Sequence, residues 1–182
     1  NTPVTQEALA KILGADLIRS TMKGDKHPAT DISLIEMFTY CDKVGGRLPT
    51  EAEWEWAARG GVSSAGYVYS GSDDLNEVGW YRENSGGAAV DLGSYWGVSG
   101  GKGTWPVGRK KGNELGLYDM SGNVWEWCWD AVGTWYRRLR GGSWNNYAVN
   151  VQVAGHALNT DADNRDDTYD SFGFRLARSS EQ

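Results

Sequence analysis

The sequence predicts an α+β fold with two main helices, short antiparallel strands and long ordered loops. Three observations lead to this prediction. Helix-start and helix-stop signals are confined to the first third of the 182 residues, and short strand-like runs separated by glycine-rich turns fill the remainder. The chain also combines 25 Gly with 10 Trp, which suits a core of few large side chains joined by irregular backbone. No linker is long enough to divide the chain, so we expect residues 1–182 to form a single domain.

Two main helices are expected near the N-terminus. The first, over residues 5–14, starts at a capping residue and stops at a glycine, and it places Leu9, Ile12 and Leu13 on one face. The second opens with the capping box SLIE at 33–36 and stops at two glycines, with apolar residues at helical spacing in between.

A third, shorter helix and several strands follow. A capping box at 50–53 opens the helix, with Trp54, Ala57 and Ala58 facing inward. The strand candidates are 66–69, 79–81, 125–129, 136–140 and 172–177. The loops between these strands are long, and loops of such length are usually functional.

Composition argues against several classes of partner. The formal net charge is -6, and no run of Lys or Arg is interleaved with aromatic residues, so we expect no nucleic-acid partner. No apolar run approaches the ~20 residues that a membrane-spanning helix needs, so we expect no transmembrane segment. We expect the protein to be a monomer.

The two cysteines do not form a disulfide framework. Cys41 lies on the apolar face of the second predicted helix, and Cys128 lies between two tryptophans, so we favour buried, inert thiols. A disulfide between Cys41 and Cys128 stays open as the alternative, because the sequence does not give the distance between the two residues.

The stretch GLYDMSGNVWEW, at 116–127, is the most specific in the chain. Asp119 and Glu126 flank a Gly-Asn turn that could direct backbone carbonyls inward, and Ca²⁺ selects carboxylates together with carbonyls. Spacing alone makes this a weak metal signal. The alternative is a turn that leads into a Trp-rich strand.

The segment 145–171 is anchored at its ends and loosely specified between them. RGGSW, at 140–144, ends in the anchor residue Trp144, and GFRLA, at 173–177, is anchored through Phe174. The residues between them have no helical period and little strand alternation. Their Tyr, His, Asn and Asp content resembles that of an antibody paratope and predicts an adaptable binding surface, with an ordinary polar loop as the alternative.

Four motifs, in order along the chain, resemble the signatures of the formylglycine-generating enzyme, or sulfatase-modifying factor, family. They are RLPTEAEWEWAARGG at 47–61, GLYDMSGNVWEW at 116–127, RGGSW at 140–144 and GFRLA at 173–177. The resemblance implies a variant of the C-type lectin fold with little regular secondary structure, which agrees with the α+β prediction.

The resemblance does not carry the enzyme's activity to this chain. In the enzyme, two cysteines shortly after the GGS segment supply the thiol chemistry, and their places fall at Asn146 and Val151. Neither residue can form a thiolate, bind Cu(I) or form a mixed disulfide, so we expect no catalytic residue and no copper. An enzyme of the same fold that uses residues other than cysteine stays open as the alternative.

Within this family, the chain most resembles the variable proteins of diversity-generating retroelements. In these proteins the segment from RGGSW to GFRLA is rewritten by adenine-directed mutagenesis, which turns Asn codons into many residue types. The resemblance implies a non-enzymatic protein, outside the cell or at its surface and lipid-anchored through a further N-terminal segment. Its segment 145–171 would bind a variable protein or another macromolecular ligand. The positions that fit the codon pattern, and that we expect to bind ligand, are Tyr147, Val149, Asn150, Gly155, His156, Ala157, Leu158, Asn159, Asp166, Asp167 and Thr168.

The same resemblance implies a calcium site in GLYDMSGNVWEW. The matching ligands are the side chains of Asp119 and Glu126 and the backbone carbonyls of Gly122 and Val124. Asp119 stands where the family has Asn, which adds charge and suits a hard cation. The alternative is a Glu126 that only accepts hydrogen bonds from backbone amides.

Overall fold

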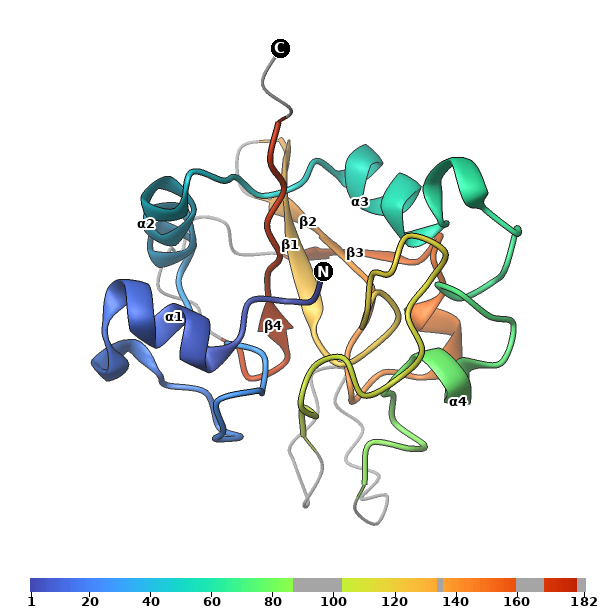
Figure 1. Cartoon of the computed structure of the whole chain (residues 1–182), viewed down its shortest axis with the longest axis horizontal. Coiled ribbons are helices and arrows are strands. Elements are labelled where there is room, and N and C mark those ends of the chain that lie inside the picture. Colours follow the sequence, from blue (N-terminus) through green and yellow to red (C-terminus); the bar gives the residue numbers. More distant parts are fainter. Residues whose placement is uncertain (87–102, 134–135, 160–168, 180–182) are drawn as a thin grey trace.

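The computed structural model describes residues 1–86, 103–133, 136–159 and 169–179. A four-stranded sheet runs through the middle of the molecule, with α1 (Gln6–Leu13) and α2 (Leu34–Val44) on one side and α3 (Glu51–Ala58) and α4 (Leu75–Val78) on the other (Figure 1). Three short 3₁₀ turns, η1 (Ala15–Leu17), η2 (Gly61–Ser63) and η3 (Ala148–Val151), lie between these elements. The predicted α+β class is confirmed.

The three predicted helices begin where their capping residues lie. Thr5 accepts a hydrogen bond from the backbone of α1, and both reciprocal bonds of a capping box are present at the starts of α2 and α3. In α3 the buried face contains Trp54 and Ala58. The one-turn helix α4, capped by Asp74, was not predicted because four residues carry too little periodicity.

The strand predictions at 66–69 and 79–81 are wrong. The first region contains only the isolated bridge between Tyr69 and Ser72, and the second only the bridge between Trp80 and Gly122. Between Tyr69 and Ser72 the chain turns back at Gly71, whose φ of 95° ends any extended run. The turn therefore leaves no room for a ladder there.

The sheet has the strand order β3-β2-β1-β4. Strands β1 (Trp125–Val132) and β2 (Tyr136–Arg140) form an antiparallel hairpin, and β3 (His156–Asn159) pairs antiparallel with β2. Strand β4 (Phe172–Gly173) pairs parallel with β1, so the prediction of only antiparallel strands is wrong at this edge. Strand β3 was not predicted, because a strand of four residues shows too little alternation to be recognised.

Large aromatic side chains fill the main core, as the composition predicts. Trp127 and Tyr169 both pack against Phe172, and Tyr40 meets Phe174 edge to face at 5.5 Å between ring centroids. Cys41 lies in this cluster, whereas Cys128 lies in a second one beside α3, and both thiols are free. The disulfide alternative is therefore wrong.

None of the helices among the described residues combines the length and the apolar character needed to cross a bilayer.

Candidate functional site

The two predicted anchors of the segment 145–171 are buried. Trp144 is 3% exposed; its backbone N–H donates to Asn123 at 3.0 Å, and its carbonyl accepts from the Ser85 hydroxyl at 2.9 Å. Phe174 is fully buried, and its carbonyl accepts from the Val4 N–H at 2.8 Å. Each end of the segment is thus held by its side chain and by its backbone.

A side-chain lock follows the first anchor. The Asn146 Oδ1 atom accepts from the Ser143 N–H at 2.9 Å and from the Ser143 hydroxyl at 2.8 Å, and the Asn146 side chain is buried. Val151 is also fully buried, against Leu75 and Val78 of α4. The two positions that match the enzyme's cysteines therefore have structural roles here.

Gly142 permits the close approach of Val151. Its φ of 72° lies in the left-handed region, and a Cβ atom at this position would lie 2.4 Å from Val151 Cγ1. The absence of a side chain at Gly142 thus lets Val151 pack directly against the backbone of RGGSW.

The middle of the segment is better specified than the sequence suggests. It contains η3 and β3, and it has buried anchors of its own at Val151 and Val153. These residues were missed because isolated apolar side chains in an irregular run give no period. A single Val at each of two non-periodic positions is the only signal the sequence offers.

The predicted ligand-binding positions lie in different environments. Tyr147 and Val149 are the most open, at 54% and 65% exposed. His156 is also exposed, whereas Asn150, Gly155 and Ala157 are half-buried. The backbones of Leu158 and Asn159 belong to β3, and Asp166, Asp167 and Thr168 lie outside the described residues.

Gly155 fits the role of a variable position less easily than the others. A Cβ atom there would lie 2.8 Å from the Asn150 carbonyl oxygen and 3.0 Å from that of Gln152. Both neighbours are backbone atoms, so a side chain at 155 requires the turn to shift.

Arg140 was missed by sequence reasoning, and it fixes the backbone of the segment. Its guanidinium is 1% exposed and donates to the Val153 carbonyl at 2.8 Å and to the Glu55 carboxylate at 2.5 Å. A longer bond reaches the Ala154 carbonyl at 3.4 Å, and Glu51 lies 3.6 Å away. Because Arg140 donates to backbone carbonyl groups, these hydrogen bonds do not depend on which side chains the segment carries. Two glutamates one turn apart on α3, complementary to the Arg of RGGSW, are the signal that could have revealed it.

Arg82 is a second neighbour that the sequence did not reveal. Its guanidinium lies 4.7 Å from the centroid of the Tyr147 ring, and its backbone N–H donates to the Asn146 carbonyl at 3.0 Å. A residue far away in sequence thus supports the most exposed aromatic side chain of the segment.

The predicted calcium ligand Glu126 does not fit a cation in this arrangement. Its side chain is fully buried, and its two carboxylate oxygens accept from Arg175 at 2.5 and 2.7 Å. Trp54 Nε1 donates to the same carboxylate at 2.5 Å. A guanidinium already supplies the positive charge there, so Ca²⁺ would have to displace it.

The Asp119 carboxylate also accepts hydrogen bonds from other residues of the protein. It accepts from the Gly108 N–H at 2.7 Å and from the Asn123 side chain at 3.3 Å, and burial raises its pKa. Across the described ranges of the chain, no three His, Cys, Asp or Glu side chains lie together as a metal-binding group. The family resemblance implies a calcium site in GLYDMSGNVWEW, whereas these contacts argue against one, and a binding measurement decides between the two.

The two thiols offer no reactive sulfur. Burial raises the pKa of Cys41 to about 11, and it raises the pKa of Cys128 further still. Cys128 lies in a cluster with Trp54 and Met120, away from the exposed part of the segment. Both thiols are therefore protonated at neutral pH and shielded from oxidants.

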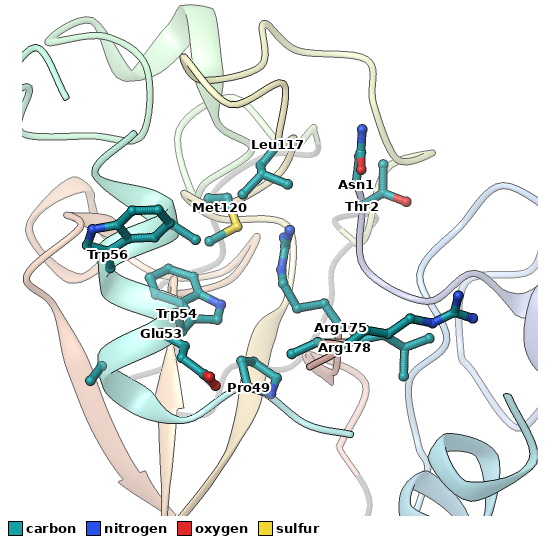
Figure 2. A pocket seen from close by; sticks show the side chains of 14 residues that line it. Asn1, Thr2, Pro49, Glu53, Trp54, Trp56, Leu117, Met120, Arg175 and Arg178 are labelled. Atoms are coloured by element: carbon teal, nitrogen blue, oxygen red, sulfur yellow. The ribbon is translucent and has the colours of Figure 1, made fainter. Parts of the chain in front are cut away.

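A hollow of about 530 Å³ lies apart from the segment, between α3 and residues 175–178 (Figure 2). Trp54 and Trp56 line one side, Leu117 and Met120 another, and Arg175 lies opposite α3. None of its described lining residues is Cys, His or Asp. Most of this lining is apolar, and Glu53, Arg175 and Arg178 are its charged side chains.

Comparison with known proteins places these features in context. The model of the sulfatase-modifying factor enzyme 1-like domain family matches residues 2–180. The formylglycine-generating enzyme of Streptomyces coelicolor is 35% identical over an alignment of 184 positions, which covers 87% of this chain and 55% of that protein. The chaperone protein LppX of Paenibacillus barcinonensis is 47% identical over 119 residues, which cover 60% of this chain and 42% of that protein. The chain thus spans about half the length of these relatives.

A solved structure resembles the fold over almost the whole chain. It is that of Treponema denticola variable protein 1, with a TM-score of 0.76 and 26% sequence identity. The match covers 96% of this chain and 81% of the other.

Proposed function

We propose, from the premise that this chain belongs to the sulfatase-modifying factor enzyme 1-like domain family, that it is a non-enzymatic ligand-binding protein whose binding surface is the segment 145–171. The observation that carries the proposal is the contrast within this segment. Tyr147 and Val149 face solvent, while the backbone beside them is held by residues elsewhere in the chain, among them Arg140 and Arg82. Side chains on such a backbone can change without loss of the fold, as in an antibody loop.

We further propose that the segment is diversified by a retroelement. The proposal is supported by the likeness to Treponema denticola variable protein 1 and by the residue types that Asn codons can reach. A reverse-transcriptase gene and a near-copy of the codons for residues 141–177 beside this gene are the expected finding. An adjacent sulfatase gene with neither feature would contradict it.

The binding role can be tested without knowing the natural ligand. Peptides would be selected on the immobilised protein from a displayed library of random peptides of about 12 residues. This length is sufficient for the peptide to form a strand. Tyr147→Ala or Val149→Ser is expected to weaken a selected peptide about tenfold or more, as truncation at a central interface residue does. Val62→Ser is the matched control, since Val62 is 92% exposed and lies outside the segment. Selected peptides that bind all these variants equally would sink the proposal.

An enzyme of the formylglycine-generating type is the second candidate, favoured by the 35% identity to the Streptomyces coelicolor enzyme. The residues at the two thiol positions, Asn146 and Val151, argue against it because neither supplies a sulfur. We expect no conversion of a sulfatase-type Cys peptide to formylglycine, with or without copper. Mass spectrometry that detects turnover above a no-protein control would establish the enzyme instead.

We also propose that the protein acts as a monomer outside the cell or at its surface, where a variable binding segment can meet foreign ligands. Sedimentation of the purified protein tests the first point. Protease treatment of intact cells tests the second, because a surface protein is expected to be cleaved while the cytoplasmic proteins stay intact.

A further inference from the structure

Strand β3 forms one edge of the sheet and carries part of the segment 145–171. It pairs with β2 through four successive residue pairs, from Arg140 opposite His156 to Arg137 opposite Asn159. In an antiparallel ladder only alternate residues bond to a given neighbour. Two of the four residues of β3 therefore direct their backbone N–H and C=O groups away from β2.

The opposite edge of the sheet is closed by the chain itself. Strand β4 has only two residues, and the backbone that follows it bonds to other segments. The Phe174 carbonyl accepts from the Val4 N–H at 2.8 Å, and Ala177 exchanges two backbone hydrogen bonds with Arg47 at 2.8 and 3.0 Å. Within the described ranges, no turn, loop or cap hydrogen bond of this kind reaches His156–Asn159.

The edge at β3 is only four residues long, which gives it some protection, but it lacks other features that usually block strand pairing. Native edges are protected by Pro, by Lys or other charges, or by a bulge. The sequence of β3 is His-Ala-Leu-Asn, and its register with β2 runs without interruption. A regular, uncharged edge of this kind is a template for one more strand.

We propose that the outer edge of β3 binds an extended strand of a protein ligand by β-strand addition. This inference rests on the proposed binding function and specifies the form of its ligand. Backbone hydrogen bonds would supply affinity that stays the same whichever side chains the segment carries. His156 is exposed while Ala157 packs against the core, as successive residues of a strand do. Exposed side chains on β3 and on the preceding turn would therefore select the ligand's sequence.

Hydrogen exchange of the free protein tests whether the edge is open. In ¹⁵N-labelled protein we expect alternation across residues 156–159, with two amides protected by β2 and the two between them exchanging as fast as loop amides. Protection of all four amides in the free protein would show that the edge is already covered, and the proposal would fall.

The peptides selected from the random 12-residue library test the ligand. N-methylation of a bound peptide at alternate positions should weaken binding about tenfold or more, from a lost hydrogen bond and a steric clash, while methylation at the positions between is tolerated. Peptide binding should also protect the two open amides of β3. A peptide that is sensitive to Tyr147→Ala but tolerates every N-methylation would overturn strand addition and leave the proposed function intact. A peptide insensitive to both sets of changes would overturn both.

Discussion

Arg175 holds both carboxylate oxygens of Glu126, with Nε–Oε2 and Nη2–Oε1 distances of 2.5 and 2.7 Å. The Glu126 side chain is fully buried and that of Arg175 is 8% exposed. The pair joins the last signature of the chain to β1, and Trp54 adds a donor from α3. Three separate segments thus meet at one carboxylate.

Removal of this carboxylate should destabilise the protein strongly. Glu126→Gln leaves the Arg175 charge buried without a counter-ion, so we expect a loss of roughly 3–5 kcal/mol in the free energy of unfolding. Urea unfolding measures it. The double variant Glu126→Leu with Arg175→Met is expected to be more stable than Glu126→Gln, because it removes both charges. If Glu126→Gln unfolds like the parent, the ion pair has no structural weight.

The same ion pair bears on the calcium site that the resemblance implies. Because the Glu126 carboxylate is already paired with Arg175, we expect the melting temperature to be unchanged by EDTA and by added Ca²⁺. A melting temperature that falls with EDTA and recovers with Ca²⁺ would show that the calcium site implied by the resemblance does form in this chain.

The sequence predicts elements with strong local chemistry and misses those that depend on distant partners. The capping boxes at Ser33 and Thr50 locate two helix starts correctly, because both partners of each box lie within four residues. Strand β3 could not be predicted, since its four residues become a strand through pairing with β2. The same limit applies to the candidate site. The exposure of Tyr147 could be expected from its place in an irregular polar stretch, whereas the hydrogen bond from Arg140 to the Val153 carbonyl depends on the path of the folded chain.

Arg140 should stabilise the segment more than an exposed arginine on the same glutamate. Arg140→Ala leaves the Val153 carbonyl without its buried donor and Glu55 with Arg59 as its remaining arginine, and we expect a loss of about 1–3 kcal/mol. Arg59 also pairs with Glu55, but its side chain is 42% exposed, so Arg59→Ala should cost about 0.5 kcal/mol or less. Urea unfolding of the two variants compares them directly. Equal losses would mean that Arg140 does not fix the segment.

The lowered pKa of Glu53 should make the free energy of unfolding depend slightly on pH. The Arg47 guanidinium, together with the Thr50 backbone, lowers the pKa of Glu53 from 4.5 to about 2. A carboxyl whose pKa is lowered on folding stabilises the protein above its unfolded pKa, and this contribution disappears as the pH falls through the folded pKa. The stability difference between the parent and Glu53→Gln should therefore shrink between pH 4.5 and about 2. A difference that stays constant over that range would contradict the pairing with Arg47.

The segment should separate into anchors and displayed residues when its side chains are truncated. Trp144→Ala and Phe174→Ala are each expected to cost roughly 3–5 kcal/mol, the usual loss for a buried aromatic residue. Tyr147→Ala and His156→Ala should change the free energy of unfolding by about 0.5 kcal/mol or less, since both side chains are exposed. The sequence predicts an equally small change in the free energy of unfolding for Leu158→Ala.

Val149 and Val151 give the sharpest form of this test, because they are the same residue type and lie two residues apart in the same stretch of chain. Val149 is 65% exposed, whereas Val151, two residues later, is fully buried against α4. Val151→Ala removes two buried methyl-sized groups and leaves a cavity, so we expect a loss of roughly 2 kcal/mol. Val149→Ala removes the same atoms from a side chain that already contacts water, and its effect should lie within about 0.5 kcal/mol of zero. Urea unfolding gives both values. If Val149→Ala and Tyr147→Ala cost as much as Val151→Ala, their side chains support the fold, and the segment cannot vary freely at the positions where we propose that ligand binds.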